Sequence, residues 1–297
     1  KTNRAVRRKG WSLASAGEYH SGWQTEDRRL TFIAKNNEVG LLDKDLSFTP
    51  LMPCSQRPFC YADTGAGIYF SDGTFIAKYD EITKTATRLE GAGSYDFPAT
   101  TAIGPAEKAD YYDAPPPGTL LQWMFGRLWV VTPDAIFYSL PYEPDKFNFA
   151  DDFIDLPEVN LLLPTDSGYF IGDKERVLYV AGTNPKAPNA TSVACAFPAI
   201  SGTGVTYSAS SFGKDGKRVA IWDSTEGKIL ADSAGAITLL TEERVAYPNA
   251  EKGATLLREL NGETHHLTAL RSPSTEGSNM RATDTAVAEV VRNGITI

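Results

Sequence analysis

Carboxylates gather at one point of the chain, where Asp151, Asp152 and Asp155 lie close to Phe149 and Phe153. A hydrolase that works by general acid and base catalysis needs two carboxylates held at a defined separation. One cluster on a loop between strands does not define such a separation, and we expect it to be a solvated loop. The cluster therefore offers no carboxylate pair on which to build a hydrolytic mechanism.

Residue types that hold metals or phosphates are also spaced unfavourably. His265 and His266 are adjacent in an expected strand, so their side chains point to opposite faces and cannot bind one metal together. The glycines of residues 201–204 lack the strand-to-helix context of a phosphate-binding loop, and no Gly-x-Ser-x-Gly motif is present. Asp43 and Asp45 resemble half of a calcium loop, but no glutamate follows at the required offset. We therefore expect no cofactor, no metal site and no enzymatic activity.

Composition bounds the class of protein. Of the 297 residues, 42% are hydrophobic and 22% are charged, which is typical of a globular domain and excludes general disorder. Three cysteines form an odd and sparse set, so a disulfide framework is not expected. No apolar run reaches the roughly 18–20 residues of a membrane-spanning helix, and the polar, basic start does not match a signal peptide. Because residue 1 is Lys and not Met, we expect an N-terminal segment of the gene product to be absent.

Positive charge is concentrated in a basic arm, residues 1–9. Its cations are Lys1, Arg4, Arg7, Arg8 and Lys9, and it contains no acid. Subtracting this charge of +5 from the net charge of −8 leaves −13 on the rest of the chain. A body this acidic repels DNA, so we expect the arm to be either a solvated tail or a docking segment for an acidic partner.

Six pairs of short β runs recur along the chain, each interrupted by a turn. In one of them the turn is Asp72-Gly73, a strong hairpin signal because type I′ turns need positive φ at both central residues. The pairs occupy residues 29–42, 67–79, 126–140, 168–181, 217–230 and 253–269. Their spacing is roughly 40 residues once a proline-rich connector is set aside.

A hairpin period of this length is typical of a β-propeller, in which each blade is one four-stranded sheet. We expect an all-β single domain over residues 1–297 with five or six blades and inserted loops near residues 95–118, 142–156 and 184–204. The C-terminal strand within residues 284–292 is expected to complete the first blade and close the ring without a free edge. A multi-sheet β-sandwich is the alternative architecture.

Four stretches resemble a family of virion proteins of tailed bacteriophages. They are residues 3–10 (NRAVRRKG), 115–139 (PPPGTLLQWMFGRLWVVTPDAIFYS), 141–182 (leading into YFIGDKERVLYVAGTNP, residues 169–185) and 282–297 (ending VVRNGITI). The second is similar to the family's Pro-Pro-Gly segment, which continues into Gly-Arg-Leu-Trp-Val, and the four stretches occur in the family's order. The turns at residues 132–133 and 173–176 depart from the family pattern, but such changes leave the blades intact.

The resemblance implies a structural subunit of a phage tail, similar to nozzle or hub proteins of short tails or to tail components of long ones. It implies as partners copies of the chain in a ring, neighbouring tail, adaptor or portal proteins, and DNA that passes through the lumen without specific binding. It also implies a location in the virion tail after assembly in the bacterial host cytoplasm. The charge of −13 fits a like-charged lumen along which DNA slides during ejection.

Loops that break the repeat are the expected interfaces between subunits, because long loops tend to carry function. Their candidate residues are Tyr112, Pro116, Trp123, Tyr142, Phe147, Phe149 and Phe153. Two other functions stay open. One is a tail-tip propeller that binds a glycan or receptor through exposed Trp and Tyr, and the other is a propeller hydrolase with carboxylates converging on the central funnel.

Overall fold

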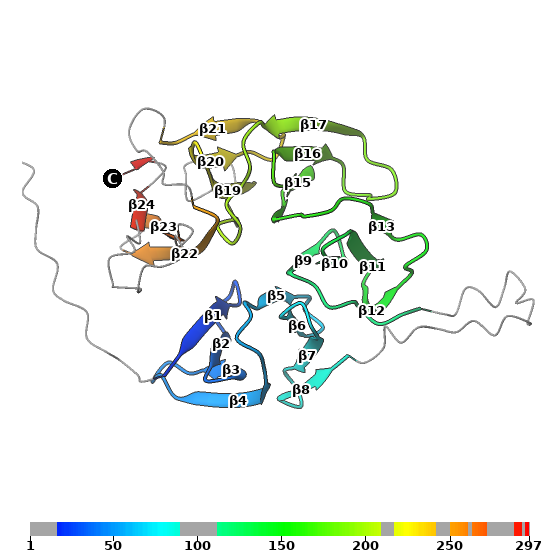
Figure 1. Ribbon diagram of the computed structural model, residues 1–297, viewed down its shortest axis with the longest axis vertical. Helices are drawn as coiled ribbons and strands as arrows, with labels where there is room; N and C mark the ends of the chain where they lie inside the picture. Colours follow the sequence, from blue (N-terminus) through cyan, green and yellow to red (C-terminus); the bar gives the residue numbers. More distant parts are fainter. Residues whose placement is uncertain are drawn as a thin grey trace, which may run out of the picture.

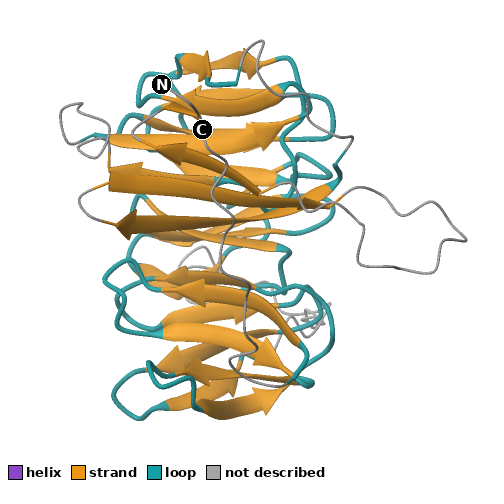
Figure 2. Ribbon diagram, turned by 90° about the vertical axis from the view of Figure 1, so that its left-hand side faces the viewer, coloured by secondary structure: helices purple, strands orange, loops and turns teal. Residues whose placement is uncertain are grey.

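The computed structural model describes residues 17–89, 112–208, 217–241, 250–260, 263–271, 288–292 and 295–296. This described part of the chain is all-β, as the sequence predicts, and contains no helix (Figure 2). It accordingly includes no helix of the length and apolar character that would cross a membrane.

The strands form six antiparallel sheets, and each sheet uses one continuous stretch of sequence. Sheet 1 contains β1 (Tyr19–Gln24), β2 (Thr31–Lys35), β3 (Glu38–Leu42) and β4 (Phe48–Pro53). Sheet 2 contains β5 (Cys60–Asp63), β6 (Ile68–Ser71), β7 (Ile76–Asp80) and β8 (Thr85–Arg88). Sheet 3 contains β9 (Leu120–Met124), β10 (Arg127–Val131), β11 (Ile136–Leu140), β12 (Glu143–Phe147) and β13 (Phe153–Ile154).

The second half of the chain repeats the pattern three more times. Sheet 4 contains β14 (Leu161–Pro164), β15 (Gly168–Gly172), β16 (Val177–Ala181) and β17 (Ala190–Cys195). Sheet 5 contains β18 (Val205–Ser208), β19 (Arg218–Ser224), β20 (Gly227–Ala231) and β21 (Ile237–Leu239). Sheet 6 contains β22 (Lys252–Leu260), β23 (Glu263–Arg271), β24 (Ala288–Arg292) and β25 (Ile295–Thr296).

Figure 1 shows the sheets following one another around a centre in chain order. The first strands of neighbouring sheets meet there, since β5 contacts β9, β9 contacts β14 and β14 contacts β18. Strands run between two faces, on which the loops gather (Figure 2). One face carries the turns between the second and third strands of sheets 1–5. We call it the pocket face, because the pocket described below opens on it, and we call the other the opposite face. This arrangement is β-propeller-like, and separate four-stranded sheets do not fit the sandwich alternative.

All six predicted hairpins are present. They are β2–β3, β6–β7, β10–β11, β15–β16, β19–β20 and β22–β23. The turn at Asp72 differs from the predicted type I′ form, because it spans four residues and only Gly73 within it has positive φ, at 82°. The Asp72 carboxylate instead closes the loop by accepting hydrogen bonds from the backbone N–H groups of Thr74 and Phe75.

Apolar side chains on both faces of the central strands pack the sheets together. In β10, Trp129 faces sheet 4 and packs on Tyr169 with ring centroids 5.1 Å apart, whereas Val130 belongs to the cluster shared with sheet 2. Successive residues of a strand point to opposite faces, so a strand buried on both sides is apolar at successive positions. The run Leu128-Trp129-Val130-Val131 is fully buried for this reason.

Two details of the predicted fold are wrong. The C-terminal strand exists as β24, but it pairs with β23 inside sheet 6, and sheet 1 is completed by β4. Sheet 1 and sheet 6 each take four strands that follow one another in the sequence, so neither sheet needs a strand from the other end of the chain. Residues 142–156 contain β12 and β13, which both pair with β11, and the loop predicted there is largely part of sheet 3.

The other predicted loops have different outcomes. Residues 184–204 contain the outer strand β17 of sheet 4. Most of the connector 95–118 lies outside the described residues, which resume at residue 112.

Candidate functional site

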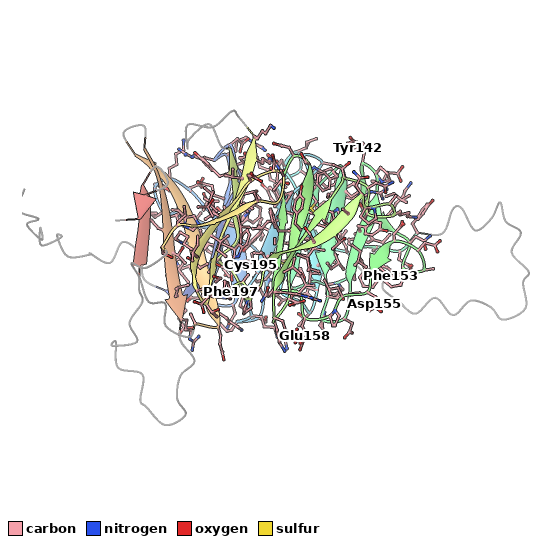
Figure 3. The ribbon with its side chains drawn as sticks, turned by 90° about the horizontal axis from the view of Figure 1, so that it is seen from above. Tyr142, Phe153, Asp155, Glu158, Cys195 and Phe197 are labelled. Carbon is pink, nitrogen blue, oxygen red and sulfur yellow. The ribbon has the colours of Figure 1, made fainter. Side chains whose placement is uncertain are left out.

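A pocket of about 630 Å³ opens on the pocket face, and we call it the central pocket. Its walls come from the starts of first strands, because Thr119 precedes β9, Asn160 precedes β14 and Glu251 precedes β22. Turns between second and third strands complete the wall through Pro133 and Thr225. Figure 3 places Glu158, which lines the pocket, toward one face and Tyr142 toward the other. The pocket therefore joins sheets 3, 4, 5 and 6 at the inner end of each.

The lining of the central pocket mixes polar groups with small apolar side chains. Its polar members are Thr119, Thr132, Glu158, Asn160, Lys174, Ser201, Thr225 and Glu251, and its apolar members are Pro133, Val159, Pro198, Ala199, Ile200 and Ala250. None of these residues is aromatic, histidine or cysteine. Carboxylates and hydroxyls of this kind bind cations and hydrogen-bond donors, whereas the lining holds no nucleophile paired with an imidazole base.

Hydrogen bonds hold the walls of the pocket in place. The Asn160 amide Nδ2 donates to the carbonyl oxygens of Ala199, at 2.9 Å, and of Asp173, at 3.1 Å. The backbone N–H of Glu158 donates to the Pro133 carbonyl at 2.9 Å, and the Glu158 carboxylate pairs with the Lys174 ammonium. These bonds connect the turns of sheets 3 and 4 to the connector that leads into sheet 5.

The two glycines of residues 201–204, which lack the context of a phosphate-binding loop, have a packing role beside the pocket. Gly202 has φ of 83°, and a Cβ there would lie 2.3 Å from the Gly253 carbonyl oxygen. A Cβ on Gly204 would lie 2.4 Å from the Leu161 side chain. At residue 202 only glycine fits, because the contact is with backbone and φ is positive, whereas at residue 204 the neighbour is the end of the Leu161 side chain; both glycines pack at the junction of sheets 4, 5 and 6.

A second group of functional side chains is buried between sheets 5 and 6, and we call it the buried ionic cluster. The Lys228 ammonium lies 2.7 Å from Asp223 Oδ1, 3.0 Å from His266 Nδ1 and 3.0 Å from Thr268 Oγ1. Asp223 and Lys228 are directly opposite in the β19–β20 ladder, and His266 and Thr268 are two apart in β23. Cross-strand partners and residues two apart share a sheet face, which is why the four meet.

Burial controls the charges of this cluster. All four side chains belong to residues that are at most 2% exposed. Burial, with the nearby Lys228 ammonium, lowers the pKa of His266 to about 3, so its imidazole is neutral at pH 7. Asp223 Oδ2 and His266 Nε2 have no hydrogen-bond partner within the described part of the chain. Such a sealed site has no route for substrate, and it acts on the packing of sheets 5 and 6.

The acidic cluster predicted to be a solvated loop is partly ordered against the fold. Asp151 and Asp155 are exposed, but Asp152 is 1% exposed and its Oδ1 lies 2.6 Å from the Lys186 ammonium. That pairing raises the pKa of Lys186. Among all the described residues, this cluster included, no three histidine, cysteine, aspartate or glutamate side chains lie close enough to hold a metal ion.

The predicted interface residues do not share one surface. Tyr142 is 80% exposed and Phe153 is 42% exposed, and Figure 3 shows Tyr142 at one face and Phe153 apart from it at the outer edge. The half-buried residues of the set are Tyr112, Trp123 and Phe149, and the buried ones are Pro116 and Phe147. Pro116 and Phe147 are therefore wrong as surface contacts, because their side chains pack inside the fold. The predicted arm residues Lys1, Arg4, Arg7, Arg8 and Lys9 lie outside the described residues.

Comparison with known proteins identifies similar structures but no family. No family model matches the chain, and no curated protein matches it. The extracellular domain of a hybrid two-component system from B. thetaiotaomicron matches with a TM-score of 0.51 and 11% identity over 85% of this chain and 32% of that chain. This chain thus spans about a third of that protein's length. Likeness at this level shows the β-propeller-like fold alone.

Two enzymes are among the similar structures. A gluconolactonase from Xanthomonas campestris has a TM-score of 0.49 and 12% identity, covering 85% of this chain and 84% of that chain. Dihydro-heme d1 dehydrogenase NirN has a TM-score of 0.48 and 12% identity, covering 93% of this chain and 54% of that chain. The expectation of no enzymatic activity, which was drawn from the spacing of candidate residues, is therefore corrected, because two of the proteins similar to this chain are enzymes. Neither likeness assigns a reaction to this chain.

Proposed function

We propose that the six sheets are the blades of a six-bladed propeller and that this propeller is a ring-forming subunit of a phage tail. In this proposal sheet 6 packs beside sheet 1 and closes the propeller by side-chain contact, because the described strands of the two sheets are not exchanged between them. The sequence resemblance described above supports the proposed position in the virion.

One observation carries the proposal. The most specific stretch of resemblance, residues 115–139, runs through β9, β10 and β11 and supplies the packing on both sides of sheet 3. Leu128 and Val130 of this stretch pack against sheet 2, and Trp129 and Tyr138 pack against sheet 4. Residues of this stretch thus pack sheet 3 against both of its neighbouring sheets.

The DNA channel in this proposal lies on the axis of the ring of subunits and not through the propeller itself. The first strand β14 is buried at all four residues, Leu161–Pro164, and it contacts both β9 and β18. A strand buried between its neighbours in this way argues against a passage for a DNA duplex through the propeller. The acidic body, at −13 without the arm, would then face DNA across the lumen between subunits.

Tyr142 is the candidate contact between subunits that the structure leaves most accessible. It is 80% exposed in the β11–β12 turn, has φ of 58° and lies over Gly126. Ile82 is 93% exposed in the corresponding β7–β8 turn of sheet 2, and it is a matched control of similar exposure.

Mass photometry of the full chain, alone and with the proteins encoded next to it, tests the proposal. We expect a ring of defined copy number, lost or weakened in Tyr142→Ser and retained in Ile82→Ser. A chain that stays monomeric under both conditions would rule out the ring subunit.

A glycan-binding function is the less favoured alternative. Sugar sites commonly use aromatic rings as stacking platforms, and none of the residues that line the central pocket is aromatic. The exposed aromatics Tyr142, Phe153 and Phe197 are distributed over the molecule (Figure 3).

A further inference from the structure

The strand β17 forms the outer edge of sheet 4, and Figure 1 shows it on the outside of the molecule. Among the described strands it pairs with β16 alone, so the backbone N–H and C=O groups on its other side have no ladder partner within the described part of the chain. The first four residues of β17 are exposed, and Val193 among them is 54% exposed. Phe197, two residues beyond the strand, is 40% exposed. An open ladder edge and two exposed apolar side chains therefore lie together.

The sequence around β17 differs from the rest of the chain in its lack of charge. Residues 187–213 contain no Asp, Glu, Lys, Arg or His, although 22% of the whole chain is charged. The exposed residues of β17 are Ala190, Thr191, Ser192 and Val193, which are small, hydroxyl-bearing or β-branched. Hydroxyl-bearing and β-branched side chains interact favourably across paired strands. The edge of β17 is therefore chemically suited to accept another strand.

The other outer strands are protected against such pairing. Proline, which has no N–H group, charged side chains and short strands all keep a foreign strand from adding to an edge. β4 contains Pro50 and Pro53, β8 ends at Arg88, and β12 contains Pro144 among three charged residues. β13, β21 and β25 have three residues or fewer. With six residues, no proline and no charge, β17 is the exception among the described outer strands.

A second copy of this chain is the occupant that best fits this edge. The chain carries a net charge of −8, so two copies repel each other wherever their charged surfaces meet. Like charges directly opposite one another in paired strands are destabilising, and a neutral edge avoids them on both sides of the contact. A basic partner would be drawn to acidic side chains, and β17 has none. The edge of β17 is therefore a place where two acidic copies can meet without repulsion.

We propose that the outer edge of β17 pairs with the outer edge of β17 in a second copy, antiparallel and about a twofold axis, so that the two copies of sheet 4 form one continuous sheet. Such a contact is isologous, because the same residues act on both sides. Val193 and Phe197 of each copy lose contact with water there, which adds apolar burial to the new hydrogen bonds. The inference goes beyond the proposed function, because this contact does not involve Tyr142 and holds whether or not the chain forms a ring.

Sedimentation velocity of the full chain across a concentration series tests the dimer. We expect the parent to associate as concentration rises, with a dimer as the first species. Val193→Lys should raise the dissociation constant about tenfold or more, because it places like charges at the new ladder. The matched control Ile237→Lys adds the same charge to a 37% exposed apolar residue of the outer strand β21 and should leave the constant unchanged. Added salt should strengthen the parent dimer, since it screens the repulsion between two acidic copies.

Hydrogen exchange locates the contact. Backbone amides within residues 190–195 should exchange more slowly in the parent dimer than in the Val193→Lys monomer, whereas those of β8 should not change. Tyr142→Ser should retain the dimer, which separates this contact from the proposed ring. Unchanged thermal unfolding shows that the variants are folded. A chain that is monomeric at every concentration, a dimer that Val193→Lys does not weaken, or protection of β17 only by a different protein would overturn the proposal.

Discussion

Sheets 1 and 2 pack together through aromatic rings, whereas sheets 5 and 6 meet around a buried ion pair. At the first interface Phe32 lies 6.0 Å from Phe70 and 5.5 Å from Tyr79 between ring centroids. At the second, the Lys228 ammonium pairs with Asp223 and lies 3.0 Å from His266 Nδ1 of sheet 6, and a small apolar cluster of described residues contains Ile200, Ala250 and Leu270. Two junctions of the same repeat thus use opposite chemistry.

The two junctions differ in how well they tolerate amino-acid substitutions. Each large aromatic side chain contributes about 1.5–3 kcal/mol to stability by leaving water. A substitution by another apolar side chain of similar volume keeps most of this contribution. A buried ion pair gains little net stability, but removing one partner leaves the other charge unpaired and dry. The junction of sheets 5 and 6 is therefore the more sensitive of the two to single substitutions.

The largest effect is expected at Lys228. The substitution Lys228→Met leaves the Asp223 carboxylate buried without its cation and lowers the free energy of unfolding by about 3–5 kcal/mol. Urea unfolding followed by tryptophan fluorescence measures the loss, since Trp222 adjoins Asp223 in β19. The double variant Asp223→Leu/Lys228→Met recovers most of it. Equal losses in the single and double variants would mean that packing volume, not charge, controls this junction.

A smaller effect is expected from an aromatic residue of the first junction. Phe32→Leu keeps an apolar side chain in the cluster and costs about 2 kcal/mol, from lost ring contacts and a partly refilled cavity. The same urea measurement gives the value. A loss as large as that of Lys228→Met would remove the contrast between the two junctions.

Acid is expected to weaken the second junction through His266. Its folded pKa of about 3 lies below the unfolded value of 6.5, so the unfolded chain takes up the proton first as pH falls. The stability supplied by the neutral imidazole is present above pH 6.5 and is lost as pH falls toward 3. At pH 5.5 the loss is about 1.4 kcal/mol relative to pH 7.5.

Thermal unfolding across this pH range checks the prediction. His266→Gln should flatten the dependence, and His20→Gln, in sheet 1, should retain most of it. A parent chain with no loss of stability between pH 7.5 and 5.5 would contradict the neutral imidazole.

The smallest effect is expected on the surface. Glu143 pairs with Lys146 at 2.8 Å, but the two side chains are 48% and 51% exposed. Water and salt screen such a pair, so Glu143→Gln should change the free energy of unfolding by less than about 0.5 kcal/mol. A loss above 1 kcal/mol in urea would show that exposed pairs matter as much as buried ones here.

The sequence alone predicted the hairpin repeat but not the packing between neighbouring sheets. Turn residues and apolar runs are local signals, and they located all six hairpins. The pairing of β24 depends on which sheet lies nearby, which no local pattern records. The cluster shows the same limit, since the Ser224–Gly227 turn places Asp223 opposite Lys228, but only the packing of sheet 6 adds His266.

The central pocket was beyond local patterns for a related reason. Thr119, Asn160 and Glu251 are far apart in sequence, and they converge because each stands where a first strand begins. A prediction that listed every residue at the start of a first strand would have found part of this wall. The buried Pro116 and Phe147 show the converse error, in which a break in the repeat was taken as evidence of a surface loop.

The contiguity of each sheet has a mechanical consequence. Among the described strands, sheet 1 uses residues 19–53 and sheet 6 uses residues 252–296, so none of them pairs into the sheet at the other end of the chain. Tension applied to the two ends would unfold the terminal sheets one at a time, and each sheet would extend only its own stretch of sequence. A stretching force would then extend the chain in steps and not unfold it all at once.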